Sequence, residues 1–65
     1  MIDYDVNLKV LSKLSVTVYE QYSYEASMFV LDELEPCLEL HWDIFKEQAE
    51  VVYEVVDARY QKREP

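Results

Sequence analysis

The stretch from Pro36 to Lys62 constrains the fold of this chain more than any other. At about 100° per residue, its apolar side chains gather on one broad face and its charged side chains on the rest of the circumference. The apolar arc covers more than half of the helix, so one neighbouring helix cannot bury it. We therefore expect a helix with at least two partners, one of them from another copy or another protein. The residues expected in this seam are Leu38, Trp42, Phe45, Val52, Val55, Val56, Tyr53 and Tyr60.

A second amphipathic pattern runs from about residue 5 to residue 33. Apolar residues recur there at steps of three and four, from Leu8 to Phe29, and Asp3 or Asp5 is suited to cap the start of a helix. Val6, Val16, Tyr24, Leu31 and Leu34 lie off this stripe. The pattern predicts one helix of about 28 residues, with a break near Ser23 as an alternative.

The rival interpretation of this half is a strand, because Leu14, Val16 and Val18 alternate with polar residues and β-branched residues favour strands. A hairpin would need a tight turn, but the chain contains no glycine and has neither Asn-Gly nor Asp-Gly. The helix is therefore favoured over residues 5–33.

The segment from Asp32 to Pro36 predicts the turn between the two helices. Proline disfavours helical geometry at Glu35 and suits the first position of a new helix. Matched lengths and a short turn predict an all-α fold, an antiparallel hairpin of helices 5–33 and 36–62 forming one domain over residues 1–65. Two such hairpins would close a dimeric four-helix bundle, a plan that resembles the Rop-type hairpin dimer in architecture.

The charge of the chain limits its partners. Fourteen acidic residues against six basic ones give a net charge of −8, and no Lys or Arg occurs between Leu14 and Phe45. Such a surface repels nucleic acid and anionic lipid and attracts a basic protein. A single cysteine excludes an internal disulfide, and the acidic start of the chain, Met1 to Asp5, differs from a secretory signal. We expect a cytoplasmic protein without membrane contact.

Cys37 and His41 are the residues with potential metal or catalytic chemistry. They lie four apart on the predicted second helix and could share a metal ion, but zinc sites need three or four protein ligands. A Cys–His catalytic pair also needs facing geometry and an oxyanion site from separate elements. We therefore expect no metal, no cofactor and no enzymatic activity.

An acidic ladder on the second predicted helix is the main functional candidate. Its carboxylates repeat every three to four residues, about 5–6 Å along the axis, so they could imitate a nucleic-acid backbone. The simpler interpretation is a solvated face. We predict a protein-binding regulator and, in a more specific form, a DNA-mimic inhibitor of a basic protein; the alternative is a chaperone or assembly subunit that binds through the apolar and tyrosine seam. The ladder consists of Glu39, Asp43, Glu47, Glu50, Glu54 and Asp57.

Overall fold

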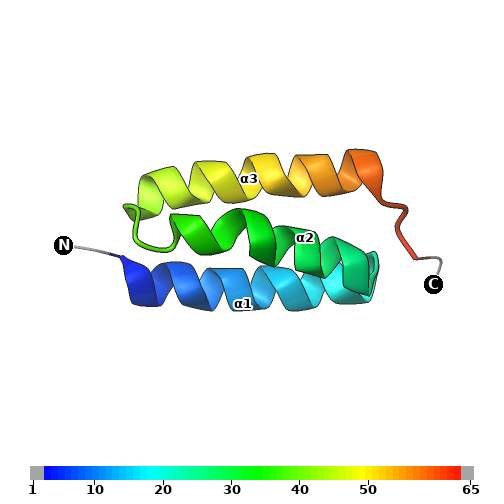
Figure 1. Cartoon of the computed structure of the whole chain (residues 1–65), viewed down its shortest axis with the longest axis horizontal. Coiled ribbons are helices and arrows are strands. Elements are labelled where there is room, and N and C mark those ends of the chain that lie inside the picture. The colour runs from blue at the N-terminus through cyan, green and yellow to red at the C-terminus, as the bar shows by residue number, and fades with distance from the viewer. Residues whose placement is uncertain (1–2, 64–65) are drawn as a thin grey trace.

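The computed structural model describes residues 3–63 and shows three α-helices there: α1 (Tyr4–Gln21), α2 (Tyr24–Leu34) and α3 (Trp42–Arg59), with a short 3-10 helix, η1 (Glu35–Cys37), after α2. In Figure 1, α1 and α3 run from left to right and α2 runs from right to left, so α2 is antiparallel to both neighbours and α1 is parallel to α3. The all-helical prediction is confirmed, and the strand alternative for residues 14–18 is wrong. None of the described helices is long and apolar enough to cross a membrane.

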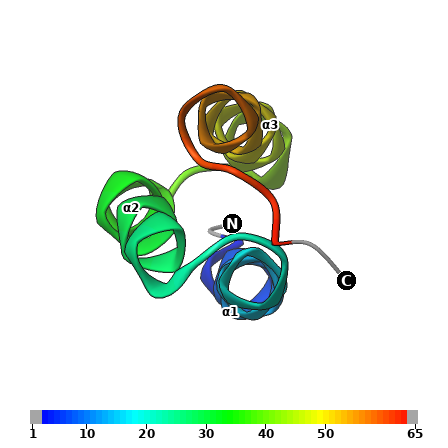
Figure 2. The same cartoon turned by 90° about the vertical axis from the view of Figure 1, so that its right-hand side faces the viewer.

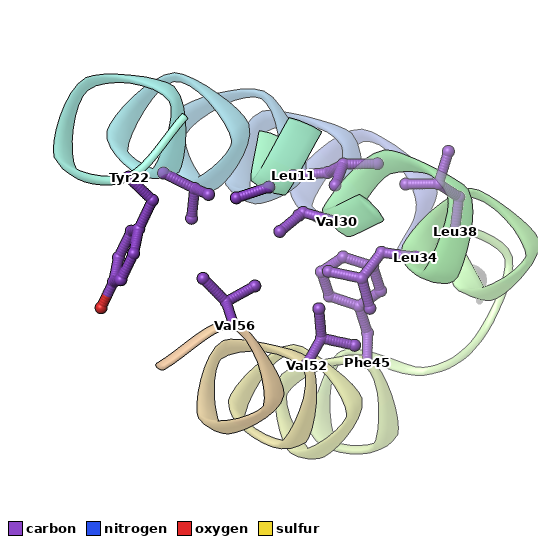
Figure 3. Close-up of a cluster of buried hydrophobic side chains, with 10 residues drawn as sticks. Leu11, Tyr22, Val30, Leu34, Leu38, Phe45, Val52 and Val56 are labelled. Carbon is purple, nitrogen blue, oxygen red and sulfur yellow. The ribbon is translucent and has the colours of Figure 1, made fainter. Parts of the chain in front are cut away.

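The core lies on the axis of the three helices. Seen along this axis, the three helices lie at the corners of a triangle, and α2 packs against both α1 and α3 (Figure 2). Leu11 of α1, Val30 of α2 and Phe45 of α3 all point into the space between the helices (Figure 3). The buried apolar residues are Leu11, Val18, Tyr22, Ala26, Val30, Leu34, Leu38, Phe45, Val52 and Val56.

The predicted helix over residues 5–33 is divided at Tyr22 and Ser23, as the alternative interpretation allowed. Ser23 is extended (φ −167°, ψ 169°), and its hydroxyl accepts a hydrogen bond from the backbone N–H of Ala26 at 3.1 Å. This serine cap satisfies one of the free N–H groups of α2. It lets the chain reverse without a glycine, and Leu34, off the stripe of a single helix, becomes fully buried in α2.

The predicted turn at residues 32–36 is also displaced. Glu35 keeps right-handed helical angles (φ −55°, ψ −44°) despite the proline that follows it, and the chain continues through η1 to Cys37. Helix α3 begins at Trp42 and ends at Arg59, whereas the sequence predicted a helix over residues 36–62. Pro36 therefore sits in the 3-10 turn and does not start the long helix.

The two-helix hairpin is wrong because the break at Ser23 supplies a third helix. Both α1 and α2 cover the buried arc of α3, where Phe45 and Val56 have no exposed surface. The apolar arc of this helix is too wide for one neighbour, but it does not require a second copy, because two neighbours come from the same chain. The dimeric four-helix bundle is accordingly not confirmed by this fold.

Candidate protein-binding surface

All six carboxylates of the acidic ladder are exposed. Five of them lie on α3; Glu39 precedes the helix, in the turn after η1. On a helical wheel the five occupy one arc, away from the side that carries Phe45, Val52 and Val56. Lys46 lies beside this arc and is the only cation of α3 before Arg59. The sequence therefore predicted correctly that these carboxylates face solvent, but the apolar arc is only partly buried, since Ile44 and Val51 are exposed as well.

An apolar groove runs beside the ladder, where α1 meets α3. Val10 and Leu14 line its α1 side, and its volume is about 240 Å³. A second depression covers the start of the ladder, and the two share Trp42, Lys46 and Glu50. A ligand seated in the groove would therefore also touch the acidic face. The α3 residues that line the groove are Trp42, Lys46, Ala49, Glu50 and Tyr53.

Polar contacts tie α1 to the start of α3 at one end of this groove. The buried Asn7 donates from Nδ2 to the backbone oxygens of Leu38 (2.9 Å) and Leu40 (2.8 Å). Asp3 Oδ2 accepts the backbone N–H of Trp42 at 2.8 Å. Asp3 thus caps α3 and not its own helix, where it makes no side-chain cap. This contact compensates for the absence of a side-chain cap at His41.

A second set of polar contacts closes the other end of the groove. The buried Tyr22 donates its hydroxyl proton to Asp57 Oδ1, and Tyr53 donates to Gln21 Oε1 at 3.1 Å. Arg63 Nε donates to the backbone oxygen of Tyr22 at 3.0 Å, and its guanidinium lies 5.4 Å from the ring centre of Tyr19. The hydrogen bond to Asp57, reinforced by burial, raises the pKa of Tyr22 above its ordinary value of 10.0. Asp57 is therefore a ladder carboxylate that also has a structural role, through its hydrogen bond with Tyr22.

The predicted seam residues fall into two groups. Leu38, Phe45, Val52 and Val56 are buried inside the single chain, so they are not available to a partner. The other four are half-buried and keep part of their surface accessible. These are Trp42, Tyr53, Val55 and Tyr60.

The structure separates the residues considered for metal chemistry. Cys37 ends η1, and His41 is extended (φ −60°, ψ 149°) just before α3, so the two do not share a helical turn as predicted. Within residues 3–63 no three or more His, Cys, Asp or Glu residues form a group that could hold a metal ion.

Sequence reasoning missed the exposed outer face of α1. Val6 and Val16 are about half exposed there, and Lys9 and Lys13 lie between them. The apolar residues off the predicted stripe were the available signal for this second surface. The face comprises Val6, Leu8, Lys9, Val10, Ser12, Lys13, Val16 and Thr17.

No protein-family model, curated protein or solved structure matches this chain.

Proposed function

We propose that this protein is a small, acidic, non-enzymatic regulator that binds the basic surface of another protein. In its specific form the proposal is that the acidic ladder occupies the surface with which a nucleic-acid-binding protein holds its ligand. The observation that carries it is the exposure of all six ladder carboxylates, five of them on one arc of α3. A rigid helix presents these charges without the entropy loss that ordering a flexible acidic tail would require.

The alternative is an assembly subunit that binds its partner through an apolar surface. An exposed apolar patch between α1 and α2 favours this function, because Val16, Tyr19, Tyr24 and Met28 line a depression there. Salt separates the two functions: electrostatic binding weakens steeply as ionic strength rises, whereas apolar docking hardly changes.

The test of the main proposal is capture followed by displacement. Immobilised protein should capture a partner from cells of its source, and the captured protein should bind duplex DNA or RNA. Adding the acidic protein should then displace the nucleic acid. The variant E47K/E50K/E54K should neither capture nor displace, whereas E25K/D32K/E33K on α2, with the same change in net charge, should do both. A captured partner that holds nucleic acid and the acidic protein together would contradict the proposal.

We further propose that the chain associates with a second copy, as the apolar surfaces outside its core support. Val16 on α1 is more than half exposed. Scattered apolar residues occur on every protein surface, but Val16 lies on the outer face of α1, which adjoins the apolar groove at Val10. Sedimentation of the purified protein at high micromolar concentration tests this, and a stable monomer there would refute it.

A further inference from the structure

We infer that two copies of this chain pair through the α1/α3 side of the bundle, with the outer face of α1 from each copy on the acidic ladder of the other. This inference rests on the self-association proposed above and specifies its surface, symmetry and charge pairs. The occupant of the apolar groove is thus a second copy of the chain.

The first support is adjacency. The outer face of α1 and the apolar groove share Val10, so they form one continuous surface. In a two-fold dimer the same surface serves on both copies, and each contact occurs twice. A surface with a lysine-bearing face at one edge and a carboxylate-bearing face at the other can meet these conditions.

The second support is charge complementarity, which selects the orientation of the two-fold axis. Lys9 and Lys13 are the only cations of α1, and they lie on its outer edge. An axis across the helices would place α3 on α3 and bring the two ladders together. An axis parallel to the helices places α1 of each copy opposite α3 of the other. Only the second arrangement pairs lysines with carboxylates.

The third support is the height of the charged residues along the common direction of α1 and α3. At the two ends of the groove, hydrogen bonds join Asp3 to Trp42, Tyr22 to Asp57 and Gln21 to Tyr53, which are 39, 35 and 32 residues apart in sequence. Because α1 and α3 run in parallel, a residue of α1 is level with the α3 residue roughly 35 positions later. Lys13 is therefore within about two residues of the level of Glu50, and Lys9 within about three of the level of Glu47, which is within the reach of these long side chains. A parallel two-fold axis preserves this level across the dimer.

The helical wheel shows that the two members of each pair also lie at similar distances from the groove, measured around the helices. Lys13 and Glu50 both lie near the groove, and Lys9 and Glu47 both lie farther from it. The axis places the outer edge of α1 on the outer edge of the partner copy's α3. The expected pairs between copies are therefore Lys13 with Glu50 and Lys9 with Glu47, around an apolar centre at Val10 and the groove.

The size of this surface predicts a weak dimer. The molecule is 17 Å wide, and an 18-residue helix is about 27 Å long, so each copy offers on the order of 450 Å². Stable complexes bury about 1,200–2,000 Å² in total, whereas two copies of this face provide only about 900 Å². We therefore expect association in the micromolar range, with monomers at low concentration.

The test is a charge exchange followed by sedimentation, at concentrations from about 5 to about 500 µM. Wild-type protein should dimerise within this range. K9E/K13E and E47K/E50K should each weaken association at least about tenfold, and the four substitutions together should restore it to within about threefold, as expected for paired charges. The control E25K/D32K, on the outer side of α2, matches the charge change of E47K/E50K and should leave association unchanged.

Circular dichroism of every variant separates loss of pairing from loss of folding. A wild-type monomer at about 500 µM would overturn both this inference and the self-association proposal. Dimerisation unaffected by the charge variants, or a folded quadruple variant that stays monomeric, would overturn the interface alone. None of these results depends on a basic partner, so the proposed regulatory function is tested separately.

A cross-linking experiment tests the axis directly. With Cys37→Ser in both chains, a chain carrying Lys13→Cys is mixed with one carrying Glu50→Cys and oxidised. A parallel axis predicts the mixed disulfide as the main product. Predominant Lys13→Cys homodimers would show that α1 packs on α1 and would refute the arrangement.

Discussion

At the scale of single residues, the ends of the bundle depend on polar groups that hydrophobic patterning does not reveal. Asn7 occupies a fully buried position, and its side chain holds the turn before α3 through two backbone oxygens. Its Oδ1 has no hydrogen-bond partner among residues 3–63. A buried amide of this kind favours one arrangement of the turn because other arrangements would leave its donors unpaired.

Asn7→Ala should lower the free energy of unfolding by about 1–3 kcal/mol, because the Leu38 oxygen would stay buried without its donor. Urea unfolding followed by circular dichroism measures this change. A loss below about 0.5 kcal/mol would show that water or a small rearrangement replaces the amide.

Tyr22 makes the free energy of unfolding depend on pH in the alkaline range. Its pKa is raised in the folded chain, mainly by the hydrogen bond to Asp57, so folding favours the protonated phenol. The stabilisation is complete below the unfolded pKa of about 10 and is lost as the pH rises above it. The difference in unfolding free energy between wild type and Tyr22→Phe should therefore be constant to about pH 9 and shrink beyond pH 10. A difference that stays constant through pH 11 would contradict this account.

At the scale of elements, the sequence correctly predicted that both halves of the chain are helical, but it misplaced the ends of the helices. The solvent-facing side of α3 follows directly from the spacing of its carboxylates. The sequence allows a break at Ser23 but does not require one, because no glycine or proline marks the reversal and serine is also common at positions where it caps no helix. The start at Trp42 could not be predicted because its cap, Asp3, lies 39 residues away in sequence.

Ser23→Ala should destabilise the protein by about 1 kcal/mol, since the first turn of α2 loses the acceptor for the N–H of Ala26. Ser12→Ala, at an exposed position within α1, is the matched control and should change stability by less than about 0.5 kcal/mol. Thermal unfolding of the two variants makes the comparison. Equal effects would mean that the cap does not define the break.

At the scale of the whole molecule, one chain supplies its own core, and the remaining apolar surface lies outside it. A seam between two hairpins would bury Val52 and Val55 alike, but here Val52 is only 6% exposed and Val55 is half-buried. This difference decides how the two positions respond to a charge.

Val52→Asp should unfold the chain at every concentration, because an unpaired carboxylate would enter the intramolecular core at a cost of several kcal/mol. Val55→Asp should leave a folded protein with a modest loss of stability. Circular dichroism at about 5 µM, where the monomer is expected to prevail, distinguishes the two. Unfolding by both substitutions would indicate a core shared between copies.

The central claim is that the acidic ladder is a working surface and not only a solvated helix face. The most direct test is the association rate constant of a captured basic partner, measured by stopped flow from about 50 to about 500 mM salt. Steering by the ladder predicts a rate that falls by at least about tenfold over this range in wild type, and a low, nearly salt-independent rate in E47K/E50K/E54K. An equal rate in the two proteins, with the same response to salt, would contradict the claim.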